Sequence, residues 1–307
     1  MGYSKIYMEA AQKAGIPGIR INSNQNRHPF IPDKMSMGKY ILINGSFVPT
    51  AEYRISLPES EAFLFSEKIR AIRTAFPFFK ENLEMMKLKL LIFNLSYPEF
   101  TDNDGAGLKR QLERTLTKNK HFLGAALTFT LRFTEQKISY TIQSEKCNPI
   151  GYELNGKGLY VELFNKIQKP VSSLSNLSIG SAIYWNIAQK HIANTLADEF
   201  LIVNSLDQII ETPESNIYLI EGKKIRGASS EQGAYIDITR PLMLDIFAQL
   251  NLEYTENEGI TSEDIREADE ALIVNSIEGI RWIVGFEGKR FLNHTIREIS
   301  ELFNQGI

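Results

Sequence analysis

The chain has one cysteine and no long apolar run, and each shortage excludes a class of protein. The single cysteine, Cys147, excludes an intramolecular disulfide and any metal site built from several cysteines, which fits a reducing compartment. No apolar run reaches the ~18–20 residues that a membrane-spanning helix needs, and the first residues lack the charged-then-apolar order of a signal peptide. We therefore expect a cytoplasmic protein without a membrane partner.

Common motifs for nucleotide, metal and serine-hydrolase chemistry are also missing. The sequence has no glycine-rich phosphate loop, no paired histidines or cysteines at metal-binding spacing, and no G-x-S-x-G elbow. Its four histidines are scattered, so we predict no metal site. A formal net charge of -3 gives no basic face for nucleic acid, which leaves small molecules or proteins as partners.

What is present is the composition of an ordinary globular protein. The 307 residues are 43% hydrophobic and 23% charged, and a chain of this length divides into two domains more readily than it builds one core. We predict an N-terminal extension at 1–37, a small domain at 38–164, a linker at 165–176 and a larger domain at 177–307. The proposed linker contains Lys169-Pro170 and three serines, which favour extended or turning backbone.

Local patterns predict both helices and strands. Apolar runs flank Asn44-Gly45, the dipeptide favoured in type I′ hairpins, so a hairpin is expected over 40–49. Apolar spacing predicts helices within 76–93 and 104–119, and alternation predicts strands over 124–132 and 138–143.

The second half continues the mixture. A helix is expected over 181–196, short strands over 271–274 and 281–286, and a last helix over 293–304, while Pro241 fits the first turn of another helix. The predicted fold class is therefore α+β.

One segment carries a resemblance to a known family. Residues 174–178 read L-S-N-L-S and precede a predicted helix. This segment resembles the active-site segment of the fold type IV pyridoxal-phosphate (PLP) enzymes, the class IV aminotransferase, branched-chain aminotransferase and aminodeoxychorismate lyase family. There the pattern L-S-N-L-K ends in the lysine that forms the Schiff base with PLP. Ser178 stands at that position, and serine has no amine for this chemistry.

Further matches extend the resemblance over roughly residues 38 to 304. Residues 197–204 are similar to the family's D-E-A-L-L-L-N strand, and 210–219 to its E-x-x-x-S-N-I-F signature. Residues 238–240 read I-T-R, although Asp237 stands where a glycine usually precedes them. Residues 268–281 are similar to the A-D-E and G-I-R motifs of lyase-like members. The resemblance implies a two-domain fold like that of D-amino acid aminotransferase.

It also implies roles for single residues. Glu211 matches the glutamate that faces the pyridine nitrogen, with a solvated loop carboxylate as the alternative. The backbone of Ile238 and Thr239, at a helix start, and Ser276 would face the cofactor phosphate. A plain N-cap for Thr239 and a turn role for Ser276 remain the alternatives.

The phosphate arginine is less well defined. Residues 65–73 (F-S-E-K-I-R-A-I-R) correspond to the family's G-D-G-x-F-E-T-I-R but lack its glycines. Arg73 is our candidate for the phosphate, and Arg70 competes with it.

Three functions fit these observations. The lysines nearest to Ser178 in sequence, Lys166, Lys169 and Lys190, are expected to be solvated, so any PLP would bind without a covalent link. The leading hypothesis is a class IV aminotransferase or lyase-like pseudoenzyme that retains a pocket for a small or phosphate-bearing ligand. The alternatives are an active transferase or lyase with an unusual arrangement, and a non-catalytic structural or regulatory dimer.

The resemblance further implies a homodimer. Large apolar side chains recur between Phe76 and Phe93, more than one helix face buries easily. We expect some of them to lie between subunits.

Overall fold

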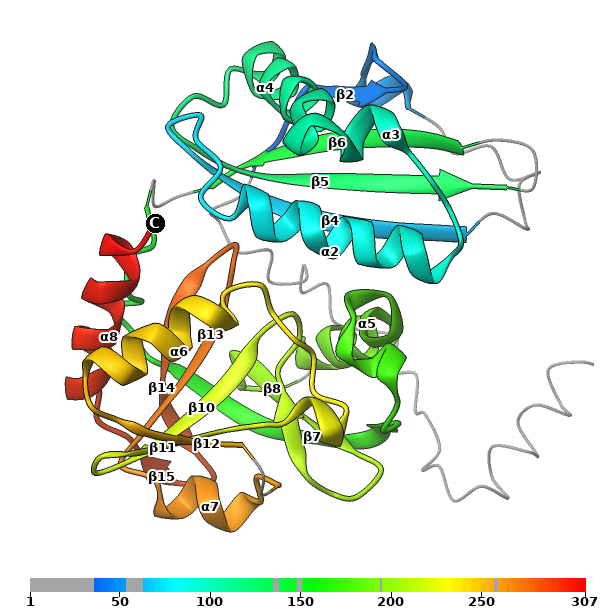
Figure 1. Cartoon of the computed structure of the whole chain (residues 1–307). Helices are drawn as coiled ribbons and strands as arrows, with labels where there is room; N and C mark the ends of the chain where they lie inside the picture. The colour runs from blue at the N-terminus through cyan, green and yellow to red at the C-terminus, as the bar shows by residue number, and fades with distance from the viewer. Residues whose placement is uncertain (1–35, 54–62, 135–137, 148–150, 194, 257–258) are drawn as a thin grey trace, which may run out of the picture. The chain divides into compact units, whose positions relative to one another are not determined.

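The computed structural model describes residues 36–307 apart from 54–62, 135–137, 148–150, 194 and 257–258 (Figure 1). The predicted N-terminal extension, up to residue 35, thus lies outside the described residues. Two sheets organise the described chain, and we call the parts built on them the small lobe (36–147) and the large lobe (151–307).

The small lobe is built on an antiparallel sheet. Its strands in the described chain have the spatial order β3-β2-β6-β5-β4, and β1 also pairs with β6. The predicted hairpin is confirmed, because Asn44 and Gly45 both have the positive φ of a type I′ turn, at 43° and 84°. The strands are β1 (Ser36–Met37), β2 (Tyr40–Ile43), β3 (Ser46–Pro49), β4 (Phe63–Ile72), β5 (Gly124–Phe133) and β6 (Ile138–Lys146).

Helices α2 (Phe79–Ile92), α3 (Pro98–Thr101) and α4 (Ala106–Asn119) pack on this sheet, and the first and last confirm the predicted helices. Short 3-10 turns cover Thr50–Glu52 and Asn103–Gly105. Leu83, Met86 and Leu90 of α2 meet alternate residues of β4, such as Phe65 and Ile69, in one apolar core. The intervening β4 side chains point to the opposite face of the sheet. Residues from both faces, Leu64 to Lys68, line the candidate site.

The large lobe has a mixed sheet with the order β12-β11-β10-β13-β14-β7-β8-β9 among the described strands, and β15 pairs with β14. Strand β7 is parallel to both of its neighbours. The strands are β7 (Leu159–Lys169), β8 (Glu199–Asn204), β9 (Ile209–Glu211), β10 (Asn216–Glu221), β11 (Lys224–Gly227), β12 (Glu253–Thr255), β13 (Glu270–Asn275), β14 (Gly279–Phe286) and β15 (Lys289–Arg290).

Strand β7 changes the predicted domain boundary. It begins at Leu159 and continues to Lys169, so the first five residues of the predicted linker belong to the large sheet. Pro170, which has no N–H to donate to a ladder, follows directly after the strand. Pattern reading missed this strand because its central position, between β14 and β8, gives it no simple alternation of apolar and polar residues.

Helix α5 (Ser178–Ile192) packs on β7 and β8, where Trp185 joins Phe164 and Phe200 in an apolar cluster. Helices α6 (Arg240–Gln249) and α8 (His294–Gln305) share another core with β10 and β13. Helix α7 (Ser262–Glu267) and 3-10 turns at Ser173–Asn176 and Ser230–Gln232 complete the lobe.

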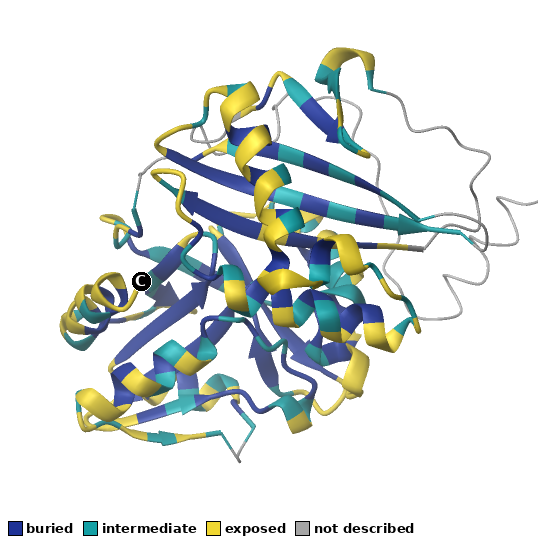
Figure 2. Ribbon diagram, turned by 45° about the horizontal axis from the view of Figure 1, so that its top comes forward, coloured by how far each residue is buried: buried dark blue, intermediate teal, exposed yellow. Residues whose placement is uncertain are grey.

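Figure 2 shows that burial is concentrated in the central strands of the large sheet and in the sheet-facing sides of the helices. The α+β prediction is confirmed. None of the helices in the described part of the chain has the length and apolar character needed to cross a membrane.

Candidate functional site

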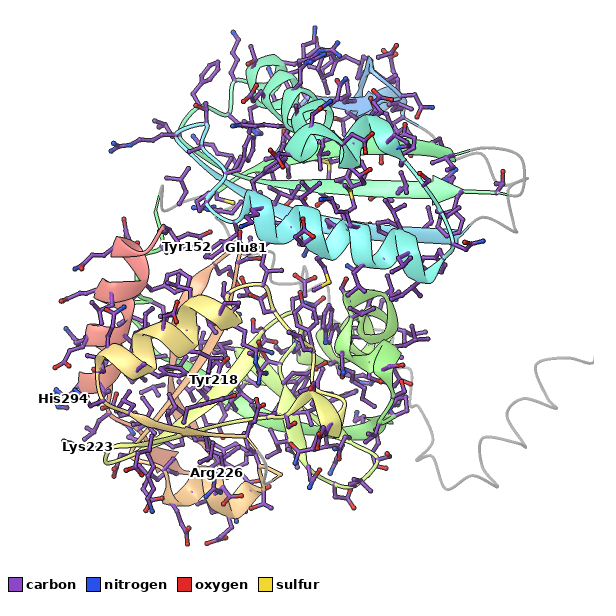
Figure 3. The ribbon with its side chains drawn as sticks, viewed as in Figure 1. Glu81, Tyr152, Tyr218, Lys223, Arg226 and His294 are labelled. Carbon is purple, nitrogen blue, oxygen red and sulfur yellow. The ribbon has the colours of Figure 1, made fainter. Side chains whose placement is uncertain are left out.

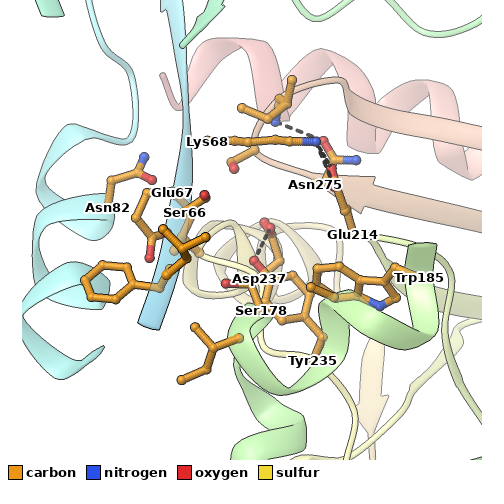
Figure 4. Close-up of a pocket in the computed structure, with 17 residues that line it drawn as sticks. Ser66, Glu67, Lys68, Asn82, Ser178, Trp185, Glu214, Tyr235, Asp237 and Asn275 are labelled. Atoms are coloured by element: carbon orange, nitrogen blue, oxygen red, sulfur yellow. Dashed lines mark hydrogen bonds and ion pairs between the residues drawn. The ribbon is translucent and has the colours of Figure 1, made fainter. Parts of the chain in front are cut away.

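Strand β4 and helices α2 and α5 enclose a cavity of about 240 Å³ together with the segments before α6 and after β13 (Figure 4). Both lobes therefore contribute to it. Its lining includes polar and aromatic side chains, which Figure 4 labels: Ser66, Glu67, Lys68, Asn82, Ser178, Trp185, Glu214, Tyr235, Asp237 and Asn275.

Ser178 lies at the first turn of α5 and lines the cavity, but it is already bonded to a lysine. The Nζ of Lys89, on α2, donates to the Ser178 Oγ at 2.5 Å. The same Nζ forms an ion pair with Glu67 of β4, and both of these charged side chains are buried. Burial raises the pKa of Glu67, while the attraction to Lys89 acts in the opposite direction. The serine thus belongs to a bonded group of three residues from two helices and a strand.

Glu211, at the end of β9, is fully buried, so a solvated loop role is excluded. Lys169 Nζ donates to both of its carboxylate oxygens at 2.8 and 2.7 Å, and Lys169 is itself buried. The expectation that Lys169 is solvated is therefore wrong. Trp185 Nε1 donates to Glu211 Oε1 at 2.6 Å, and the Tyr235 backbone N–H donates to Oε2 at 2.6 Å.

These donors leave Glu211 with a complete set of partners. Burial raises the pKa of the carboxyl group and lowers that of the Lys169 ammonium group, while their mutual attraction opposes both shifts. Glu211 is not among the residues that line the cavity, whereas Trp185 and Tyr235, which bond to it, are. The carboxylate is thus held on the far side of two aromatic residues.

Asp237 lies between Tyr235 and the start of α6. Its Oδ1 accepts hydrogen bonds from the Thr239 backbone N–H at 2.9 Å and from the Thr239 hydroxyl at 2.6 Å. The Tyr235 hydroxyl donates to Oδ2 at 3.4 Å, and the Ser276 backbone also bonds to this carboxylate. Desolvation raises the pKa of Asp237 to about 6, although these hydrogen bonds lower it. A side chain of the protein therefore occupies the donors of the predicted anion site.

The other predicted phosphate residues are only partly brought together. Ile238 and Ser276 line the cavity. Thr239 is fully buried and is the N-cap of α6, but its side chain does not cap the helix because it bonds to Asp237. Arg73 is exposed, in the turn that follows β4, and does not line the cavity.

Arg70, the competing arginine, is buried but also lies outside the cavity lining. Its guanidinium group lies 5.6 Å from the centre of the Tyr152 ring and donates to the Gly151 carbonyl at 3.4 Å. The cation of β4 that does line the cavity is Lys68, which pairs with Glu214 through Nζ–O distances of 2.5 and 2.7 Å.

Sequence reading missed three contributors, Lys89, Lys169 and Asp237. Lys89 has no signal in the sequence, since it lies on the apolar side of a helix 89 residues before Ser178. Asp237 has a signal in the sequence, because aspartate stands directly before the helix start where the family resemblance expects a glycine. Three of the four histidines, His121, His191 and His294, lie in the described chain, and Figure 3 shows His294 at the outer end of α8. In the described chain no group of three or more potential metal ligands forms.

Comparison with solved structures gives the same fold. The branched-chain aminotransferase of Thermoproteus uzoniensis, solved with norvaline, is 19% identical with a TM-score of 0.74, covering 87% of this chain and 94% of that one. A putative 4-amino-4-deoxychorismate lyase of Legionella pneumophila is 18% identical with a TM-score of 0.70, covering 83% and 97%. A branched-chain aminotransferase of Thermobaculum terrenum in its PLP form is 14% identical with a TM-score of 0.72, covering 88% and 94%.

No curated protein matches the sequence. The family model described as amino-transferase class IV matches residues 67–285, from the middle of β4 into β14, which include most of the residues that line the cavity. The chain therefore belongs to the amino-transferase class IV family.

Proposed function

We propose that this member of the family has lost PLP-dependent transamination and lyase chemistry and retains its cavity as a binding site for a small molecule. The observation that carries the proposal is the state of Ser178. It stands where the resemblance places the Schiff-base lysine, and its hydroxyl is bonded to the buried Lys89–Glu67 pair. A serine hydroxyl forms no Schiff base and is a poor proton carrier near neutral pH.

The residues around the cavity do not fit PLP at two further places. A protonated pyridine nitrogen needs a carboxylate oxygen that is free to accept a hydrogen bond from its N–H. The Glu211 oxygens already accept hydrogen bonds from Lys169, Trp185 and Tyr235. A phosphate group needs N–H and hydroxyl donors, but those of Thr239 are used by Asp237.

The charge of Asp237 also opposes phosphate binding at Thr239. A phosphate dianion at the start of α6 would lie next to a carboxylate that is ionised at neutral pH, since its pKa is about 6. Like charges in a buried site repel strongly because little water screens them. No lysine or arginine of the described chain forms an ion pair with Asp237 to offset this repulsion. The residues around the cavity thus do not support a reaction step through PLP.

A second candidate is an active enzyme that uses Lys89. Its Nζ lies 2.5 Å from the side chain that replaces the family lysine, so an amine is present at the correct end of α5. Against this candidate, Lys89 is 1% exposed and paired with Glu67, and it does not line the cavity.

The experiment is to add PLP to the purified protein, record the visible spectrum, reduce with borohydride and map any phosphopyridoxyl peptide. The proposal expects no PLP fixed to any lysine and no transaminase or lyase turnover. A phosphopyridoxyl group on Lys89, lost in Lys89→Met, would establish the second candidate. The matched control is Lys87→Met, which removes a partly exposed lysine of the same helix that pairs with Glu84.

A further inference from the structure

Two of the three carboxylates that line the cavity have cationic partners. Glu67 pairs with Lys89, and Glu214 pairs with Lys68. Asp237 is the third, and the described residues offer it hydrogen-bond donors without a positive charge. Ionised at neutral pH, it therefore leaves the cavity with an uncompensated negative charge.

A buried charge without a counter-charge is costly because it has lost water and gained no opposite charge in return. Asp237 is only 2% exposed. Its hydrogen bonds from Thr239 and Tyr235 offset part of the lost hydration, but a positive group in the cavity would offset more.

The wall beside Asp237 also suits a positive group. Trp185 and Tyr235 both line the cavity, with ring centres 4.9 Å apart and planes at 80°. Trp185 is fixed in place by its bond to Glu211. Aromatic faces attract ammonium groups, and tryptophan does so most strongly.

We propose that the cavity binds an organic cation, a small ammonium compound with an apolar body, through the Asp237 carboxylate and the Trp185–Tyr235 wall. The charge preference of the site is thus the reverse of that implied by the family resemblance, which places a phosphate at the same helix start. This inference rests on the proposed function, because it requires a cavity that PLP does not fill.

The test measures by calorimetry how the full-length protein binds three probes that share one ring. Benzylamine is cationic at neutral pH, benzyl alcohol is neutral and phenyl phosphate is anionic. We expect benzylamine to bind about ten- to a hundredfold more tightly than benzyl alcohol, the difference that one charge-assisted contact provides. Phenyl phosphate should bind most weakly.

Asp237→Asn removes the charge and keeps an oxygen that can accept from Thr239. It should reduce the preference for benzylamine over benzyl alcohol to near unity. The matched control, Asp245→Asn, removes a carboxylate from an exposed position on α6 and should leave the preference unchanged. Asp237→Gly, which frees the Thr239 donors, should shift the preference towards phenyl phosphate.

Equal binding of benzylamine and benzyl alcohol, or tighter binding of phenyl phosphate, would overturn the inference. The comparison on the unmodified protein decides this even if an Asp237 variant does not fold. Failure of this inference is distinguishable from failure of the proposed function. The calorimetry tests the inference, whereas the separate borohydride experiment would detect PLP fixed to a lysine.

Discussion

Lys169 at the end of β7 donates both of its described hydrogen bonds to Glu211 at the end of β9, and both side chains are fully buried. Strand β7 of the large lobe thus supplies the positive charge that balances Glu211, the residue that the resemblance matches to the glutamate facing the pyridine nitrogen. The two residues are 42 positions apart in the sequence, so the fold brings the pair together.

We predict that Lys169→Met destabilises the protein by about 3–5 kcal/mol, because it leaves Glu211 buried without a cation. Urea unfolding measures this change. Lys166→Met, at an exposed position on the same strand, is the control and should change stability little. The double variant Lys169→Met with Glu211→Gln removes both charges and keeps an oxygen that can accept from Trp185 or Tyr235, so it should recover part of the loss. A double variant as unstable as the single one would contradict the prediction.

Ser178→Lys should not create activity. The new ammonium group would enter a space where Lys89 Nζ already bonds to position 178, and two buried like charges repel. We expect a less stable protein with no transaminase or lyase turnover, measured by thermal unfolding and product assays. Ser173→Lys, at an exposed position just before α5, is the control and should leave the stability unchanged. Turnover in the Ser178→Lys variant that the unmodified protein lacks would refute this expectation.

Gly180 holds the first turn of α5 close to the preceding segment. A Cβ at this position would collide with the Leu174 carbonyl oxygen, and a backbone neighbour moves less easily than a side chain. Gly180→Ala should therefore cost about 1–3 kcal/mol, the usual range for overpacking. Gly156→Ala is the matched control, since a Cβ there meets nothing within 4 Å. Equal stability of the two variants would contradict the prediction and show that α5 can move away from the Leu174 carbonyl without cost.

Glu199 should make stability depend on pH. It is buried on β8 with Arg281 3.6 Å away, and burial raises its pKa to about 7. A carboxyl whose folded pKa is raised holds its proton more tightly in the folded state. Its stabilising effect is therefore complete below the ordinary value of 4.5 and is lost as pH rises through about 7.

The measurement is urea unfolding at pH 5.5 and pH 8.5. Glu199→Gln stays neutral and should lose less stability between these values than the unmodified protein. Glu231→Gln, on an exposed 3-10 turn, should follow the unmodified protein. Parallel pH profiles for Glu199→Gln and the unmodified protein would contradict the assignment.

We propose that the protein is a homodimer, but the residues first expected to carry the interface do not support this. Phe76, Phe78 and Met86 are buried within the chain itself. The apolar side chains left exposed on α2 are Leu88, Leu91 and Ile92, with Leu91 at 75% exposed. Leu64 of β4 is also 52% exposed. Exposed apolar side chains that gather in one patch often mark subunit contacts.

Light scattering should report about twice the chain mass of 34.9 kDa at micromolar concentration. Leu91→Glu should shift the protein towards the monomer because it places a charge in the proposed contact. Leu196→Glu, at a 91% exposed position outside α2, is the control and should leave the mass unchanged. A monomer at all concentrations would refute the proposal.

Local order was readable from the sequence. The Asn44-Gly45 hairpin, helices α2, α4 and α8, and the α+β class follow from turn chemistry and apolar periodicity, which act between residues close in the chain. Of the residues that the motifs singled out, Ser178, Ile238 and Ser276 line the cavity, whereas Glu211 and Thr239 do not. Two of the departures, Ser178 and Asp237, are visible as substituted letters.

Only the tertiary structure decided what those substitutions do. Lys89 reaches Ser178 across 89 positions, and Lys169 reaches Glu211 across 42, so their roles depend on packing between distant elements. A lysine in a sequence gives no indication of burial, because its charge favours water unless a partner is brought to it in the folded chain. The sequence thus determined the fold class and the local elements, and packing between distant elements determined which side chains bond to one another in the site.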